Sequence, residues 1–530
     1  MDQASSPTNT LLSGTELHEN FQRAAQSFAE LTASMLGPRG AYKIVVPNEG
    51  DFIVTRDCRR VLETIEIDHP IGRLLYSTAS EQSTGSGDGV VTAVFLASTL
   101  LDACTDSVRD GRLHARTVYG GLERSRRIAE DAIDDVSIPV DADPTDERVR
   151  AVTRAQTRTA FDAHEATLAD TVTETLSALA ADARPSAAGG LVLDTDDRVH
   201  VFARRGRSRG ETRRFDGVLV KTEPLASELT PVRDARVATV DQKLYLETID
   251  GDDETSRRYT VSSPDELDAL SRAEDARFER LAEPILDAGV DVLVTRKGID
   301  DRLSNALARE GVVVVRRAKP EEILESVAAA TGATVVGDVR DLSDATVGYA
   351  GTVETLRVGQ LAYTHFGECR DATANTILTR GGTWTGAEDT ERGLEAILRG
   401  TAAVVREPAV VPGGGFTEAA VARRLRSAAK ETPTREALVL ETVAEAFEAV
   451  VSALARNSGL DPLDAVTTVR ARLPDETVGV VDPPAFGGAA VGDVVKAEIL
   501  DSARVKRTAV SSALQTATYA IPIDEVLATK

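Results

Sequence analysis

Asp88 stands between two glycines where a loop rich in glycine and serine enters an apolar segment. The stretch reads Thr84-Gly85-Ser86-Gly87-Asp88-Gly89-Val90-Val91-Thr92-Ala93-Val94-Phe95. A helix that begins here would present free backbone N–H groups and the positive end of its dipole, and both attract anions such as phosphates. An acid would repel a bare phosphate. Asp88 is therefore either a simple helix N-cap or a ligand that holds Mg²⁺ against phosphates.

Three other short motifs combine glycine, proline or an acid in loops. They are Leu36-Gly37-Pro38-Arg39-Gly40, Thr55-Arg56-Asp57-Cys58 and Pro412-Gly413-Gly414-Gly415. Taken alone, Asp57 suits a turn after a strand, and the glycine run suits a turn between helices. Phosphate hydrolysis would use the same residue types differently, because it requires a metal that bridges phosphate oxygens, donors that absorb developing charge and a carboxylate that positions water.

Helices and a hairpin are expected around the first motifs. Hydrophobic residues recur every three or four positions from Glu16 to Met35, which predicts an amphipathic helix. Tyr42 to Val46 and Phe52 to Thr55 are typical of the two strands of a hairpin, and Asp57 follows the second. Val90 to Leu101 is apolar nearly all round, so it should form a buried helix directly after Asp88.

The middle of the chain follows a different pattern. Runs typical of strands at Val290 to Thr295, Val312 to Val315 and Thr334 to Val336 alternate with helical segments, which predicts βαβ units and a parallel sheet. From Glu388 the chain returns to helices. Helical blocks that flank a βαβ middle predict a multidomain α/β protein in which both chain ends pack into one discontinuous domain.

Composition limits the possible partners. The chain has 61 Lys and Arg against 85 Asp and Glu, a formal net charge of −24, and nucleic acid is not expected as a partner because phosphate backbones demand basic surface. Apolar runs such as Val90 to Leu101 are shorter than the roughly 20 residues of a membrane span. We therefore expect a cytoplasmic protein with no membrane partner. Cys58, Cys104 and Cys369 are too scattered for a disulfide framework or a zinc site.

The charged residues are also skewed in type, because only nine residues are lysine and arginine supplies the other basic groups. One hypothesis is an acidic surface adapted to a salty cytosol, where counterions screen the repulsion between carboxylates. The alternative is a surface whose charge only keeps the protein soluble.

Taken in order, the motifs resemble those of the group II chaperonins, the archaeal thermosome family. Several further segments add to the resemblance: Asp68-His69-Pro70, Arg296-Lys297-Gly298-Ile299-Asp300-Asp301, Ala330-Thr331-Gly332-Ala333, Asn457-Ser458-Gly459-Leu460-Asp461-Pro462, Arg504-Val505-Lys506 and Ile521 to Ala528. The resemblance covers nearly the whole chain, and motifs that are weak singly gain force from their order and spacing.

The resemblance implies a chaperonin fold with three domains. A mainly helical equatorial domain would comprise residues 1–143 and 404–530, and a small intermediate hinge domain residues 144–208 and 367–403. An α/β apical domain, residues 209–366, would bind unfolded protein, with a built-in lid projection at Asp250 to Ser271. Such subunits, identical or different, form double rings whose cavity closes when ATP binds, so ATP, Mg²⁺ and unfolded clients are the implied ligands.

The resemblance also implies roles for individual residues. Leu36, Gly37 and Pro38 would offer backbone groups to the phosphates, and Asp88 would ligate Mg²⁺. Gly89, Val90, Val91 and Thr92 follow Asp88 and would complete the nucleotide-binding turn. Gly415 would pack on the ribose, and Asp501 would accept hydrogen bonds from its hydroxyls. The implied catalytic acids are Asp57, which would orient the attacking water, and the hinge acid that follows Arg380-Gly381-Gly382-Thr383. Counting along the chain places that acid at Glu388, with Asp389 adjacent.

The sequence departs from the family pattern at this site. Val90 and Val91 replace two threonines that follow Gly-Asp-Gly, and only Thr92 keeps a hydroxyl. Thr159 falls where the family often has a lysine, although Arg158 is adjacent, and Glu388 is one methylene longer than the usual Asp. Two functions therefore remain open: an ATP-dependent folding chaperonin, and a structural or regulatory ring subunit whose ATPase is impaired.

Overall fold

The computed structural model describes most of the 530-residue chain. The described ranges are residues 11–47, 52–161, 165–222, 231–245, 278–316, 318, 323–358, 361–370, 374–481 and 488–527. The chain divides into two compact units. Unit 1 comprises Met1–Leu193, Ala203–Thr212 and Thr379–Lys530, and unit 2 comprises Asp194–Phe202 and Arg213–Leu378.

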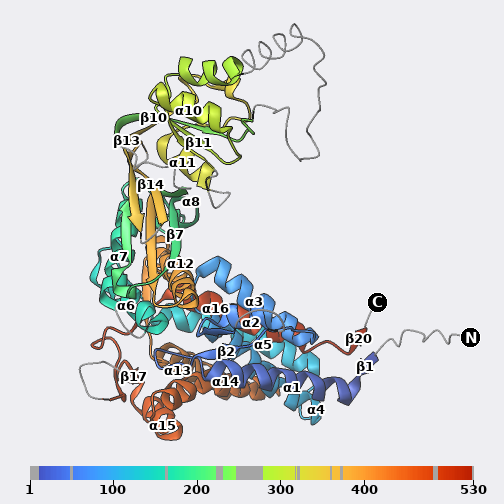
Figure 1. The fold of residues 1–530 in the computed structure, drawn as a ribbon. Helices are drawn as coiled ribbons and strands as arrows, with labels where there is room; N and C mark the ends of the chain where they lie inside the picture. The colour runs from blue at the N-terminus through green and yellow to red at the C-terminus, as the bar shows by residue number, and fades with distance from the viewer. Residues whose placement is uncertain are drawn as a thin grey trace, which may run out of the picture. The chain divides into compact units, whose positions relative to one another are not determined.

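Unit 1 is mainly helical. Its helices are α1 (Gly14–Ala33), α2 (Cys58–Thr64), α3 (Pro70–Ser86), α4 (Val90–Arg109), α5 (Ala115–Asp135), α6 (Glu147–Ala160), α7 (Glu165–Ala180), α12 (Trp384–Arg406), α13 (Phe416–Lys430), α14 (Glu436–Asn457), α15 (Pro462–Arg472) and α16 (Ala503–Ala520), with a 3₁₀ turn at Arg209–Glu211. Helices from both chain ends share one hydrophobic core, in which α4 packs against α1, α14 and α16 (Figure 1). The expected discontinuous domain is therefore present.

The strands of unit 1 are short. They are β1 (Leu11–Ser13), β2 (Lys43–Val45), β3 (Ile53–Thr55), β4 (Ile138–Pro139), β5 (Arg184–Pro185), β6 (Leu191–Val192), β16 (Ala409–Pro412), β17 (Val478–Val481), β18 (Ala490–Asp493), β19 (Leu500–Ser502) and β20 (Glu525–Leu527). Strand β2 pairs antiparallel with β3, which confirms the expected hairpin pairing, and the turn residues Asn48 to Gly50 lie outside the described residues. Strand β1 pairs antiparallel with β20, so the first and last strands of the described chain lie side by side (Figure 1).

Helix α4 extends further than its apolar run suggested, from Val90 to Arg109. Within the described part of the chain it is the helix whose length and composition would allow it to cross a membrane. Most of that stretch is buried inside the protein, with Val94, Leu96 and Leu100 fully buried. The apolar character of α4 is therefore accounted for by its central place in the core, as predicted for a buried helix.

Unit 2 is built on a six-stranded sheet in the order β12-β11-β10-β13-β14-β9. Its elements are α8 (Thr195–Arg198), β7 (Val199–Arg205, which continues into unit 1), β8 (Arg213–Asp216), β9 (Val218–Thr222), β10 (Val232–Val240), β11 (Val292–Thr295), α10 (Asp301–Arg309), β12 (Val313–Val315), α11 (Ile323–Thr331), β13 (Gly348–Val358), β14 (Leu361–Cys369) and β15 (Asn375–Gly381), with a 3₁₀ turn at Val339–Asp341. Strands β10, β11 and β12 run parallel, which confirms the βαβ prediction. Alternate residues of β11 enter different cores: Val292 and Val294 pack with α11, and Leu293 packs with α10.

Some expectations are only partly met or fall outside the described residues. Thr334 to Val336 contributes an isolated bridge from Val336 to Val240 rather than a strand. The predicted lid projection, Asp250 to Ser271, lies outside the described residues. The two compact units do not separate a hinge domain from an equatorial domain, so the division into three domains stays a prediction.

Candidate functional site

Unit 1 contains a cavity of about 670 Å³. Both chain ends line it, with residues from the loops before α2, α4 and α13, from α6 and α12, and from the start of α16. The residues predicted to bind the nucleotide all line this cavity, as does Asp57: Leu36, Gly37, Pro38, Asp88, Gly89, Val90, Val91, Thr92, Gly415 and Asp501. The fold therefore brings together motifs that lie hundreds of residues apart.

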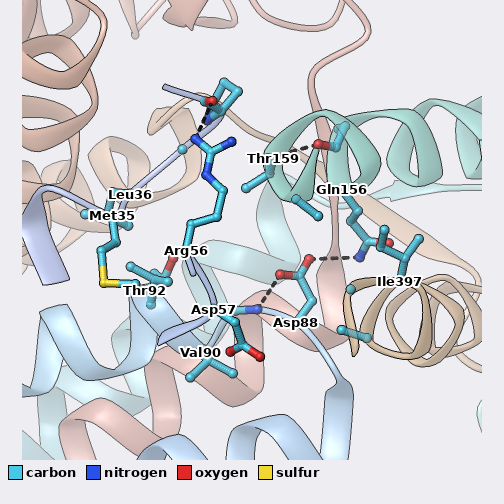
Figure 2. A pocket seen from close by; sticks show the side chains of 18 of the residues that line it. Met35, Leu36, Arg56, Asp57, Asp88, Val90, Thr92, Gln156, Thr159 and Ile397 are labelled. Atoms are coloured by element: carbon cyan, nitrogen blue, oxygen red, sulfur yellow. Dashed lines mark hydrogen bonds between the residues drawn. The ribbon is translucent and has the colours of Figure 1, made fainter. Parts of the chain in front are cut away.

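Asp88 is held at the N-terminus of α4 by two hydrogen bonds. Its Oδ1 accepts from the backbone N–H of Gly89 at 2.6 Å, and its Oδ2 accepts from Nε2 of Gln156 on α6 at 2.8 Å (Figure 2). Burial and the nearby charge of Asp501 raise the pKa of Asp88 above its ordinary value. A cation beside this carboxylate would offset both effects.

The backbone of this loop requires glycine on both sides of Asp88. Gly87 has φ +72° and Gly89 has φ +78°. A Cβ on Gly87 would lie 2.6 Å from the carbonyl oxygen of Ala396. Gly89 is the N-cap of α4 and provides no side-chain cap, so the first N–H groups of α4 are open to a ligand in the cavity.

Helix α13 presents a second glycine-capped N-terminus to the same cavity. Gly415 is its N-cap with φ +83°, again without a side-chain cap, and a Cβ there would lie 3.0 Å from Cγ2 of Val451. Its neighbour Gly414 has φ +61°, and a Cβ on it would lie 2.6 Å from the carbonyl oxygen of Val480. The glycine run is therefore more than a flexible turn, because larger residues would not fit.

The loop at Leu36 to Pro38 is fixed from two sides. The side-chain amide of Asn457 donates to the carbonyl of Ala33 at 2.8 Å and to that of Leu36 at 2.9 Å. Arg56 donates to the carbonyl of Pro38 at 2.9 Å and also to that of Gly40 (Figure 2). These bonds hold the loop backbone at the edge of the cavity.

Asp57 combines a structural position with a place in the cavity. It is the N-cap of α2, and its Oδ1 accepts from the backbone N–H groups of Arg59 at 2.9 Å and Arg60 at 3.3 Å. Cys58 begins the helix and is buried without a positive φ, so cysteine is compatible with the backbone at this position. Since the cap uses one carboxylate oxygen, the other is available to a ligand.

Glu388 and Asp389, the neighbouring acids at the start of α12, are placed differently. Asp389 lines the cavity, whereas Glu388 is not among the described residues that line it. Arg60 donates to both, at 2.5 Å to Asp389 Oδ1 and 2.9 Å to Glu388 Oε2. Burial raises the pKa of Asp389, Arg60 and a hydrogen bond from Thr55 lower it, and the charge of Asp57 raises it again. Asp57 and Asp389 come from distant segments of the chain, and both line the cavity.

A buried ion-pair cluster borders the cavity near Asp501. The ammonium of Lys506 lies 2.8 Å from Glu418 Oε1 and 2.9 Å from Asp501 Oδ2. Burial alone would lower the pKa of Lys506, but the two carboxylates outweigh it and hold that pKa above its ordinary value. Glu418 is 1% exposed, so its charge depends on Lys506 for compensation.

The substituted positions also face the cavity. Val90, Val91 and Thr92 line it from the first turn of α4, so the two valines stand where a hydroxyl could reach a phosphate. Thr159 and Arg158 line it from the end of α6. The Thr159 hydroxyl donates to the carbonyl of Ala155 at 2.9 Å.

The donor set fits a magnesium ion that is bound together with phosphates. No group of three or more His, Cys, Asp or Glu side chains gathers to hold a metal in the described ranges. Mg²⁺ usually takes one or two carboxylates and completes its shell with water and substrate phosphates. Asp88, whose carboxylate lines the cavity beside the open N-terminus of α4, matches that requirement.

Sequence reasoning missed several residues that shape the site. Gln156 and Arg60 contact the key acids from other helices, and neither gives a local signal in the sequence. Lys506 was part of a matched motif, but its contact with Glu418 joins two helices 88 positions apart. Such residues could be found only once the helices were packed.

Comparisons with known proteins identify the family of the chain. The TCP-1/cpn60 chaperonin family profile matches residues 28–530. The chain is 34% identical to thermosome subunit 3 of Haloferax volcanii over 98% of this chain and 96% of that protein. It is 31% identical to thermosome subunit alpha of Halobacterium salinarum, over 95% and 87% of the two chains, and 30% identical to thermosome subunit beta of Archaeoglobus fulgidus, over 96% and 91%. The chain therefore belongs to the TCP-1/cpn60 chaperonin family, as a group II chaperonin subunit.

Proposed function

We propose that the cavity of unit 1 binds Mg-ATP and that this chain hydrolyses it. The chain is a subunit of an ATP-dependent protein-folding chaperonin, and ATP hydrolysis is known for its family. The observation that carries the proposal is the meeting of Asp88 with two uncapped, glycine-initiated helix N-termini in one cavity. Phosphates and a divalent cation are the ligands that such an arrangement attracts.

Each predicted residue has a place in this binding mode. The backbone at Leu36 to Pro38 and the first turn of α4, from Gly89 to Thr92, would donate to the phosphates. Asp88 would hold Mg²⁺. Gly415 would leave room for the ribose, and Asp501 would accept from its hydroxyls. When bound, the metal would neutralise charge on the phosphate oxygens, which lowers the barrier to attack by water.

Asp57 and Asp389 would orient the attacking water between them. The water oxygen forms a bond to the γ-phosphorus, the bond from that phosphorus to the bridging oxygen of ADP breaks, and a carboxylate takes the proton that the water loses. Asp389 suits this role because burial raises its pKa and it lines the cavity. Glu388, the acid that the sequence register favours, is the alternative for the same role.

From the family we also propose how this chain assembles and where it is located. The chain would join identical or related subunits in a double ring in the cytoplasm, and residues 209–366 would bind unfolded protein. Residues 1–143 with 404–530, and residues 144–208 with 367–403, would act as the equatorial and hinge domains. Neither the comparisons nor the described residues favour the alternative of a subunit with an impaired ATPase.

Steady-state phosphate release from the purified full chain with Mg-ATP tests the proposal. Asp57→Asn and Asp389→Asn should each lower the rate by about 100-fold or more, since a positioned acid or base contributes about 10² to 10⁴. Asp68→Asn changes an acid whose side chain is 97% exposed and serves as the matched control with an unchanged rate. A wild-type rate no higher than that of Asp57→Asn would contradict the proposal.

A further inference from the structure

Arg60 is a buried cation with two acidic partners. It is 6% exposed and lies in the first turn of α2. One guanidinium nitrogen is 2.5 Å from Asp389 Oδ1 and the other is 2.9 Å from Glu388 Oε2. Arginine stays charged in proteins, so its burial requires carboxylates at this position.

The first turn of α2 also fixes the carboxylate of Asp57, the N-cap of this helix. The backbone N–H of Arg60 donates to Asp57 Oδ1 at 3.3 Å, while its side chain reaches Asp389 on α12. Thr55 forms a second link, because its hydroxyl accepts from the backbone N–H of Asp57 at 3.1 Å and donates to Asp389. The relative position of Asp57 and Asp389 is therefore set by Arg60 and Thr55.

Arg60 affects Asp389 through its charge as well as through packing. Asp57 and Asp389 line the same cavity, and burial together with the charge of Asp57 raises the pKa of Asp389. The guanidinium opposes both effects. Its second nitrogen is occupied by Glu388, whose side chain is 31% exposed compared with 14% for Asp389. The planar fork thus holds the shorter, more buried acid at the cavity and the longer acid beside it.

We propose that Arg60 is a positioning residue that places Asp389 opposite Asp57 for attack by water on ATP. Glu388 completes the pairing of the guanidinium and does not itself contact the water. The inference rests on the proposed function, because it assigns a role within the same hydrolysis step. It adds a residue that touches neither nucleotide nor metal and acts only through the two acids it pairs with.

The test compares variants of the full chain by phosphate release and by the affinity for Mg-ADP. Arg60→Met should lower kcat by about 100-fold, the order of loss expected from misplacing a reacting group by about 1 Å. The KM for ATP and the Kd for Mg-ADP should stay within about threefold of wild type. Arg60→Lys should recover part of kcat, because an ammonium can pair with one acid but cannot form the fork.

Arg126→Met is the matched control. Arg126 also pairs with two carboxylates, those of Glu123 and Glu130, and it is not among the described residues that line the cavity. The kcat of the Arg126→Met variant should equal that of wild type. If Arg60→Met does not fold, the comparison of Asp389→Asn with Glu388→Gln decides, and Asp389→Asn should cause the larger loss of kcat.

Three results would overturn the inference: an Arg60→Met variant with wild-type kcat, equal losses in kcat and in Mg-ADP affinity, or a larger loss in Glu388→Gln than in Asp389→Asn. Failure of the proposed function gives a different result. In that case wild type itself would release no phosphate above the Asp57→Asn background, before any Arg60 variant is compared.

Discussion

Restoring hydroxyls at Val90 and Val91 should strengthen nucleotide binding and speed turnover. Both valines lie in the first turn of α4, are partly exposed and line the cavity. Val→Thr replaces one methyl group with a hydroxyl of nearly the same size, so the packing of α4 should change little. A hydrogen bond to a charged group contributes about 1.5–3 kcal/mol, which corresponds to about 10–150-fold in affinity per productive hydroxyl.

The assay measures Mg-ATP turnover and the Kd of a non-hydrolysable ATP analogue for the double variant Val90→Thr/Val91→Thr. Thr92→Val should change both quantities in the opposite direction. Val108→Thr makes the same chemical change on the last turn of α4, outside the described cavity lining, and should leave both unchanged. If the double variant and Thr92→Val both stay within twofold of wild type, hydroxyls on this turn do not reach the phosphates.

Other perturbations test charge and backbone. Lys506→Met should lower the free energy of unfolding, measured by chemical denaturation, by about 3–5 kcal/mol, because it leaves the charge of the buried Glu418 uncompensated. The double variant Lys506→Met/Glu418→Gln should regain much of that stability. Burial and the charge of Glu395 raise the pKa of Glu391 from 4.5 to about 7. Because the folded protein holds this proton more tightly than the unfolded chain, wild type should lose stability relative to Glu391→Gln as the pH rises from about 4.5 to 7. Equal dependence of stability on pH in the two proteins would refute this. Gly415→Ala should weaken ATP binding, because residue 415 adopts φ +83° and an added Cβ would lie 3.0 Å from Cγ2 of Val451. Unchanged ATP binding would contradict the argument that only glycine fits at this position. If the acidic surface is adapted to salt, the melting temperature should fall on dialysis into dilute buffer, and retained folding would count against that hypothesis.

The sequence predicted those parts of the site that depend on local backbone. Gly87, Gly89 and Gly415 adopt positive φ angles that glycine permits, and such positions can be recognised from short motifs. The buried helix after Asp88 was also predictable, because its hydrophobic residues cover most of its surface. Its end was not, since polar residues such as Asp102 and Asp106 extend the helix on its more exposed side to Arg109.

The sequence register assigned the catalytic acid to Glu388, whereas the structure places its neighbour Asp389 in the cavity lining. Neighbouring residues on a helix point about 100° apart, so the packing of α12 decides which side chain enters the cavity. That packing depends on contacts such as the one between Arg60 and Asp389, which are 329 positions apart. The same reason explains why Gln156 was missed, because it reaches Asp88 across 68 positions.

A structure of the full chain with Mg-ADP and aluminium fluoride, a mimic of the transferring phosphate, tests the central claim most directly. We expect the nucleotide in the cavity of unit 1, the metal on Asp88, and the fluoride beside Asp57, with Asp389 within hydrogen-bonding distance of the attacking water. A nucleotide bound elsewhere, or a metal held without Asp88, would contradict the proposed site. A complex in which Glu388 replaces Asp389 at the water would contradict the assigned hinge acid.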